Sequence, residues 1–202
     1  MRNFGLRVSE FEFRRLPNVM RMKTQGRIIS DTQTLWAIDP THSTVEFVIK
    51  KLFMFNVRGS LTKFEGSLVL DSADVRRSSA TVVLQSASIS TGNERRDKQL
   101  QAANFLDAER YPEIRFESTK VEPGTDRDTL RVSGSLTVKD TTREIVLDVS
   151  EIDRSCSPSG EHVAYYTALT SLDRVAFRVD AMRLLIGRKL QITINVQATR
   201  PS

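Results

Sequence analysis

The sequence contains one cysteine, Cys156, among 202 residues, so no disulfide bond can form within a single chain. The absence of disulfides is typical of proteins that work in a reducing compartment. Cys156 lies in the Ser-, Pro- and Gly-rich segment 154–160, which predicts a loop. No histidine stands in a recognisable pattern that would activate this thiol, so we expect an incidental cysteine rather than a catalytic nucleophile.

The usual signatures of catalysis and of cofactor binding are also missing. The two histidines, His42 and His162, lie far apart, and neither has a partner at metal-ligand spacing. The chain has no glycine-rich dinucleotide loop, no phosphate loop and no Gly-x-Ser-x-Gly elbow around Ser43. We therefore predict no catalytic residue, no metal and no cofactor. We expect the turn residue His42 to hydrogen-bond to the local backbone, and contact with a ligand is the alternative.

Long hydrophobic runs and a concentrated charge on the main part of the chain are absent as well. No window approaches the ~18 consecutive apolar residues that a membrane-spanning helix needs. The net charge of +5 is concentrated in residues 1–33, where seven Lys or Arg accompany three Asp or Glu; the remainder has 23 against 22. Such a nearly neutral remainder offers no basic stripe for a phosphate backbone, so we predict that nucleic acid is not a partner.

Residues 1–33 differ from the rest of the chain. Apolar residues recur there at loosely helical spacing among arginines, and Pro17 interrupts any single helix. We expect a basic tail outside the folded domain, either disordered or added by an upstream start codon. The alternative is an amphipathic segment that touches a membrane surface. Charged residues interrupt every candidate core of a secretory signal, so we expect a cytoplasmic protein.

Between residues 34 and 200 the dominant pattern is alternation of apolar and polar residues. About eight segments follow the two-residue period of a strand at hairpin-like spacing, and Leu130–Val138 is the clearest. Val57–Leu70 is expected to be one long strand. No strand is followed by a long helical crossover, so the pattern predicts an antiparallel sandwich or barrel. Eight strands can close into a barrel that holds side chains or one small ligand, and periodicity does not separate these two cases.

The segment Ser90–Ser118 interrupts this alternation. It opens with the turn signal Thr91-Gly92-Asn93 and continues in a charged run long enough for about two helical turns. We predict a short helical cap across one end of the β-structure. In Arg95-Arg96-Asp97, an arginine could hold an anionic head group, but we expect Asp97 and an arginine to pair locally and hold the cap.

A series of motifs spread over about residues 34–198 carries further information. They are Trp36-x-Ile38-Asp39-Pro40-x-His42-Ser43-x-Val45-x-Phe47, Val57-Arg58-Gly59-Ser60-Leu61-x-x-Phe64-x-Gly66, Ser90-Thr91-Gly92-Asn93-x-x-Arg96-Asp97-x-x-Leu100, Asn104-Phe105-Leu106-Asp107, Tyr111-Pro112-x-Ile114-x-Phe116-x-Ser118 and Val132-x-Gly134-x-Leu136-Thr137-Val138. In these motifs the chain resembles the YceI-like family of lipocalin-like, polyisoprenoid-binding proteins. It departs from the family at Asp140, usually glycine, at Glu144, frequently proline, and at Asp173–Arg178, which loosely matches a late Asn-Arg-x-x-Phe-Gly motif.

The resemblance implies an all-β fold, an eight-stranded antiparallel lipocalin-like barrel over residues 34–200 with a short helical cap insertion. It also implies an apolar tunnel for an isoprenoid-type lipid, such as a polyprenyl lipid or a quinone, that is bound and carried without chemistry. Together with the strand alternation it predicts that the tunnel is lined by Val45, Phe47, Phe53, Phe55, Phe64, Leu68, Leu84, Phe105, Phe116, Leu136, Leu147, Tyr165 and Ile192.

His42 and Arg96 are the candidate head-group contacts. Transient membrane contact and a homodimer remain open as partners. Two other interpretations of function also remain open: a hydrolase that uses His42 on a lipid-like substrate, and a stress-protective structural module whose barrel is filled by side chains.

Overall fold

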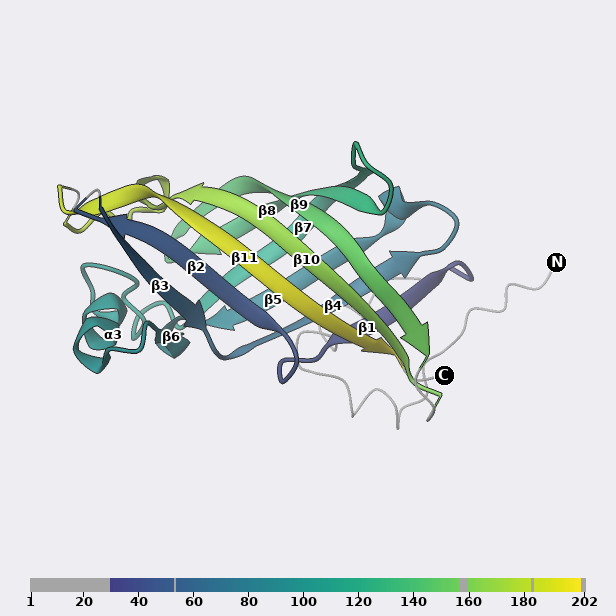
Figure 1. Ribbon diagram of the computed structural model, residues 1–202, viewed down its shortest axis with the longest axis horizontal. Helices are drawn as coiled ribbons and strands as arrows, with labels where there is room; N and C mark the ends of the chain where they lie inside the picture. Colours follow the sequence, from purple (N-terminus) through teal and green to yellow (C-terminus); the bar gives the residue numbers. More distant parts are fainter. Residues whose placement is uncertain (1–29, 53, 157–159, 183, 201–202) are drawn as a thin grey trace.

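In the computed structural model, residues 30–52, 54–156, 160–182 and 184–200 are described, and they form one antiparallel β-structure with a single α-helix, α3 (Glu94–Gln101) (Figure 1). Short 3-10 helices occur at η1 (Val75–Arg77), η2 (Ser86–Ser88) and η3 (Arg174–Phe177). The strands are β1 (Gln33–Ile38), β2 (Thr44–Lys51), β3 (Phe55–Leu61), β4 (Phe64–Asp71), β5 (Ser79–Gln85), β6 (Ile89–Ser90), β7 (Glu113–Pro123), β8 (Thr129–Val138), β9 (Thr141–Cys156), β10 (His162–Asp173) and β11 (Ile186–Arg200).

Eight of these strands close into a barrel in the order β1, β4, β5, β7, β8, β9, β10 and β11. The ring is closed by antiparallel pairing of Ala37 and Ile38 in β1 with Thr199 and Ala198 in β11. β2 follows β1 along the same edge of β11, and β3 and β6 extend the sheet beyond β2. The predicted eight-stranded all-β barrel with a helical insertion is therefore confirmed.

Two boundaries differ from those predicted. The segment 57–70 is not one long strand, because the chain bends at Thr62 and Lys63 between β3 and β4. The loop expected from residue 154 begins later, since β9 continues to the exposed Cys156 by pairing with β10. Ser and Arg at the end of a strand look like loop residues in sequence, but they are compatible with pairing when their side chains face solvent. Of the tail predicted over residues 1–33, residues 1–29 lie outside the described residues. The last residues of that range belong to the fold, because Thr32 hydrogen-bonds to Asp71 and Gln33 begins β1.

Inward-facing glycines give room to aromatic side chains on neighbouring strands. A Cβ at Gly134 would lie 2.5 Å from the ring of Phe116, and one at Gly59 would lie 2.4 Å from the ring of Phe47. Any larger residue at either position would push the ring away from the wall. Glycine inside these strands therefore leaves room for the rings of Phe116 and Phe47 to approach the neighbouring strand closely.

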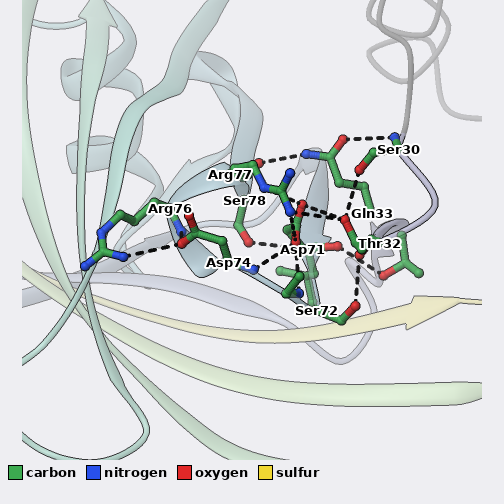
Figure 2. A network of polar contacts seen from close by, with 12 residues as sticks. Ser30, Thr32, Gln33, Asp71, Ser72, Asp74, Arg76, Arg77 and Ser78 are labelled. Atoms are coloured by element: carbon green, nitrogen blue, oxygen red, sulfur yellow. Dashed lines mark hydrogen bonds and ion pairs between the residues drawn. The ribbon is translucent and has the colours of Figure 1, made fainter.

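A polar network fastens the end of the barrel away from α3 (Figure 2). Asp71 is buried at the end of β4, where it accepts hydrogen bonds from the backbone N–H groups of Ala73 (2.9 Å) and Asp74 (3.0 Å). Thr32 and Arg77 reach its second oxygen, each at 3.1 Å. Burial raises the pKa of this carboxyl, but the two N–H groups, Thr32 and Arg77 outweigh it, so the pKa lies below its ordinary value.

Candidate ligand-binding cavity

A cavity of about 380 Å³ runs inside the barrel, and all eight strands of the ring contribute to its lining. Most lining side chains are Val, Leu, Ile and Phe on the inward faces of the strands. The volume falls within the range of ~300–1,000 Å³ found for small-ligand pockets. The barrel is thus hollow over this volume rather than completely filled by its own side chains.

Ten of the thirteen side chains predicted to line a tunnel do line this cavity. They are Val45, Phe47, Phe64, Leu68, Leu84, Phe105, Phe116, Leu136, Leu147 and Ile192. They come from β2, β4, β5, β7, β8, β9 and β11 and from the segment after α3. Period-2 alternation identified their faces correctly because the opposite face of each of these strands is mainly polar.

Two of the predicted lining residues lie elsewhere, and Phe53 lies outside the described residues. Tyr165 is 37% exposed on the outer face of β10, and its neighbour Tyr166 lines the cavity instead. Both faces of β10 carry apolar residues, so the alternation did not identify the inward one. Phe55 is 59% exposed at the tip of the β2–β3 hairpin, beyond the cavity lining, because β3 begins at the rim of the barrel.

Helix α3 covers one end of the cavity, as predicted for the cap. Asn93 begins the helix by accepting a hydrogen bond from the N–H of Arg96 (3.0 Å), an ordinary N-cap. Arg96, Gln99 and Leu100 of the helix then line the cavity, together with Phe105 and Leu106 just after it. The polar lining residue Lys51 lies at this same end, where β2 pairs with the start of β11.

The motif around Thr91 fixes the orientation of Arg96. Asp97 accepts hydrogen bonds from the N–H (2.9 Å) and the hydroxyl of Thr91. The guanidinium of Arg96 donates to the Thr91 hydroxyl (2.7 Å) and carbonyl (3.0 Å). Asp97 does hold the cap locally as expected, but through Thr91: no ion pair between Asp97 and an arginine is seen in the described ranges. Thr91 therefore holds Arg96 at the cavity, where a candidate head-group contact has to lie.

Arg174, which sequence reasoning missed, is a buried cation in the cavity wall beside the same end. It is 6% exposed, and its guanidinium donates to the backbone carbonyls of Val179 (2.7 Å), Ala181 (2.9 Å), Gly187 (2.9 Å) and Ile186 (3.0 Å). These carbonyls belong to the loop from η3 to β11 and to the start of β11. A single side chain therefore organises the backbone of this whole loop.

The loosely matching motif at 173–178 now has a structural explanation. Asp173 caps η3 by accepting from the N–H of Val175 (3.0 Å) and also pairs with Arg188 (2.5 Å), which holds the pKa of Asp173 below its ordinary value. Arg178 stands where the family motif has glycine, and it adopts a left-handed conformation with φ of 58°. Its side chain pairs with Asp140 (3.5 Å), so two positions at which this chain departs from a family glycine face each other.

The opposite end of the barrel is closed by Trp36, which is 3% exposed. Trp36 packs with Ala164, Tyr166 and Ala198. The guanidinium groups of Arg154 and Arg200 lie 5.8 and 5.5 Å from its ring centroid, and Arg154 donates to the Tyr166 hydroxyl at 3.0 Å. Burial raises the pKa of Tyr166 by disfavouring the phenolate, so the phenol stays neutral at physiological pH.

His42, the second candidate head-group contact, does not reach the cavity. Its side chain is 62% exposed, and Nδ1 lies 2.7 Å from the carboxylate of Asp39 in the turn between β1 and β2. This hydrogen bond is the main reason that the pKa of Asp39 lies below its ordinary value. His42 does bond locally, but its partner is the side chain of Asp39 and not the backbone that was predicted. The described residues contain no group of three His, Cys, Asp or Glu that could hold a metal.

Comparison with known proteins places the chain in a family. A family model described as YceI-like domain matches residues 36–198. A UPF0312 protein of Pseudomonas putida is 32% identical over 159 residues, 79% of this chain and 82% of that protein. No helix in the part of the chain that the structure describes has the length and apolar character needed to cross a membrane.

Solved structures share the fold. BcnA of Burkholderia cenocepacia superposes with a TM-score of 0.72 at 21% identity, covering 79% of this chain and 98% of BcnA. A domain of Saccharophagus degradans, described as a polyisoprenoid binding domain implicated in plant cell wall breakdown, superposes with a TM-score of 0.61 at 14% identity, covering 82% and 98%. At these identities the likeness is one of fold.

Proposed function

This chain belongs to the YceI-like domain family, and from that premise we propose that it binds an isoprenoid-type lipid, a polyprenyl lipid or a quinone, with the apolar tail inside its barrel. The observation that carries the proposal is the cavity of about 380 Å³ with an apolar wall, closed by Trp36 at one end and bordered by polar side chains at the other. The Saccharophagus degradans domain, described as polyisoprenoid-binding, supports this choice of ligand class.

Binding would be driven by burial of the tail. Apolar surface removed from water contributes about 25 cal/mol per Å², or roughly 0.8 kcal/mol per buried CH₂ group. A prenyl tail offers many such groups, so few polar contacts are needed to offset the cost of ordering the ligand. A protein that binds and carries a lipid, without making or breaking bonds, needs an apolar cavity and few polar contacts. This proposal assigns no catalytic role to His42.

The head group is placed by the polar residues of the α3 end. Lys51, Arg96 and Gln99 all line the cavity there, and two of them are cationic. Arg96 is oriented by Thr91, and a guanidinium has five N–H donors. Such an end suits a head group with hydrogen-bond acceptors, as in the carbonyl oxygens of a quinone or the phosphate of a polyprenyl phosphate.

Native mass spectrometry of the purified full chain, followed by organic extraction and lipid identification, tests the proposal. A stoichiometric prenyl lipid or quinone would support it and would also report whether the protein is a monomer or a homodimer. A clean apo mass, combined with refusal of added ubiquinone and polyprenyl phosphate, would refute it. The cytoplasmic location remains a prediction, which fractionation of cells expressing the full chain would test.

Two variants distinguish ligand binding in the tunnel from ligand binding or catalysis at His42 in the exposed β1–β2 turn. Leu136→Asp puts a carboxylate among buried lining residues and should abolish ubiquinone uptake, because a buried charge opposes an apolar ligand. His42→Ala should retain most of the uptake, since its side chain lies outside the cavity. Circular dichroism of both variants controls for folding. Equal loss in both, or turnover of a lipid ester that His42→Ala removes, would contradict the proposal.

A further inference from the structure

Two neighbouring loops at the α3 end of the barrel expose an unusual concentration of large apolar side chains. The loops are the β2–β3 hairpin tip and the segment before β11, at the far left of Figure 1. Of the nine exposed large hydrophobic residues in the described part of the chain, six lie on these loops: Leu52, Met54, Phe55, Met182, Leu184 and Leu185. We call these six residues the apolar tip.

The two loops form one platform. The N–H of Leu52 donates to the carbonyl of Leu185 at 2.7 Å, and Lys51 pairs with Ile186 at the start of β11. Leu52 and Met182 have positive φ angles of 51° and 53°, which bulky residues seldom adopt. Leu184 and Met54 remain 87% and 78% exposed. The backbone therefore holds strained turns that keep apolar side chains in solvent, a cost that folding alone does not explain.

Basic residues outnumber acidic ones around the apolar tip. Residues 48–60 carry Lys50, Lys51 and Arg58 and no acidic residue, and residues 180–189 carry three basic residues and one acidic residue, Asp180. Arg188 is offset by its ion pair with Asp173, but Lys50, Lys51 and Lys189 are exposed. Exposed apolar side chains beside lysines fit a lipid bilayer, which has an apolar interior and can have an anionic surface. A second copy of the same tip would place like charges against each other.

The apolar tip also borders the cavity. Met182 belongs to both the tip and the cavity lining, and it contacts Gln99 of α3 (Sδ to Nε2, 3.8 Å). Lys51 and Gln99 are lining residues that are also exposed, and both lie at this end. An apolar ligand that left the cavity here would pass directly over the apolar tip. This juxtaposition links the exposed surface to the bound lipid.

We infer that the apolar tip docks into the surface of an anionic lipid bilayer, so that a lipid moves between bilayer and barrel at the α3 end without crossing water. The inference rests on the proposed function for the nature of the cargo. Docking requires only that the six apolar side chains enter the interface while the lysines contact lipid phosphates. The barrel would stand on the membrane with the end that holds Trp36 and the Asp71 network directed away from it.

Vesicle flotation of the full chain tests the docking. Vesicles of phosphatidylcholine with phosphatidylglycerol should bind the protein, and pure phosphatidylcholine vesicles should bind it more weakly. The double variant Met54→Asp with Leu184→Asp should bind at least tenfold more weakly, since two apolar anchors become charged. The matched control, Ile152→Asp with Leu169→Asp, changes two apolar residues that are 64% and 51% exposed on other parts of the barrel, and it should stay within twofold of the unaltered chain.

Equal loss in the two double variants would overturn the inference, as would unchanged binding of the tip variant. Residues 1–29 are present in every protein compared, so their contribution cancels. Dimerisation of the unaltered chain that the tip substitutions abolish, without vesicle binding, would likewise overturn it and identify a dimer interface.

Uptake of N-phenylnaphthylamine in vesicle-free buffer separates docking from tunnel binding. Met54 and Leu184 do not line the cavity, so the tip variant should take up this probe like the unaltered chain. A tip variant that has lost probe uptake together with vesicle binding would count against docking as a separate event. Vesicle binding through the tip by a protein that takes up neither this probe nor ubiquinone and polyprenyl phosphate would leave docking standing and refute the proposed cargo.

Discussion

Replacing Ala168 by Phe is expected to block the tunnel without unfolding the barrel. Ala168 is 7% exposed and lines the cavity midway along β10. It pairs with Val149 in β9 and Ile194 in β11, whose side chains line the cavity as well. The added ring would therefore enter a cavity of about 380 Å³ rather than a packed core.

The sign of the stability change distinguishes a hollow barrel from a filled one. Burying a Phe side chain contributes about 1.5–3 kcal/mol, and fixing its rotamers costs about 0.5–1 kcal/mol. In a hollow barrel the free energy of unfolding should stay the same or rise by up to about 2 kcal/mol. In a filled barrel, overpacking would lower it by about 1–3 kcal/mol. Urea unfolding of the ligand-free protein measures the difference.

The same substitution should weaken ligand binding strongly. Excluding one isoprene unit of five carbons removes up to about 4 kcal/mol at roughly 0.8 kcal/mol per carbon. If half of that contact is recovered elsewhere, the remaining loss of about 2 kcal/mol corresponds to roughly thirtyfold in Kd. Fluorescence titration with ubiquinone of the series Ala168→Val, Ala168→Leu and Ala168→Phe should show a graded loss.

Leu169→Phe is the matched control, because the next residue of the same strand is 51% exposed on the outer face. It adds an aromatic ring to β10 without entering the cavity, so ligand affinity should be unchanged. The reasoning would be refuted if Ala168→Phe bound ubiquinone like the unaltered chain, because the ligand would then lie elsewhere. A loss of stability above about 1 kcal/mol would equally refute a hollow lumen at this level.

Three further predictions concern the framework of the cavity. Arg178→Gly should raise the free energy of unfolding by about 0.5–1 kcal/mol, because relief of the left-handed conformation exceeds the loss of an exposed ion pair; thermal unfolding would show a higher Tm. Arg174→Leu should cost about 3–5 kcal/mol by leaving buried carbonyls without donors, and an unchanged urea midpoint would contradict the clamp. The pKa values of Asp71 and Asp173 lie below 3.8, so both carboxylates stabilise the fold above about pH 4, and this contribution is lost as the pH falls through their folded-state values. Urea midpoints should therefore fall on acidification, with a shallower fall in Asp71→Asn.

The inward faces of most strands were predictable from the sequence because their two faces differ in polarity. Along β8, Val132, Leu136 and Val138 alternate with polar residues, so the inward face was unambiguous. Along β10, the face that contains Tyr165 and the face that contains Tyr166 both carry several apolar residues. Only the pairing register of β10 with β9 and β11 determines which of them faces the cavity, since Ala168 pairs with the lining residues Val149 and Ile194.

The cavity itself was predictable only in part. Thr91, Arg96 and Asp97 were visible as a motif, and the structure shows their mutual hydrogen bonds. Arg174 was missed because a charged residue is expected to be exposed unless groups that pair with it are known. The four backbone carbonyls to which it donates could not be identified from the sequence. The apolar tip was missed because four consecutive apolar residues at 52–55 look in sequence like residues that are covered or that line a cavity, and Phe55 was therefore assigned to the lining.

β11 follows all the other strands of the sheet in sequence, which has a consequence for synthesis. β11 pairs with β10, β1 and β2, and the residues joined at the seam with β1 are separated by about 160 positions in the chain. At translation rates of ~5–20 residues per second, β1 and β2 wait on the order of ten to thirty seconds for this partner. During that interval the growing chain carries open sheet edges that can pair with other nascent chains. The seam that completes the tunnel is thus formed last, and until it forms the chain is most exposed to aggregation.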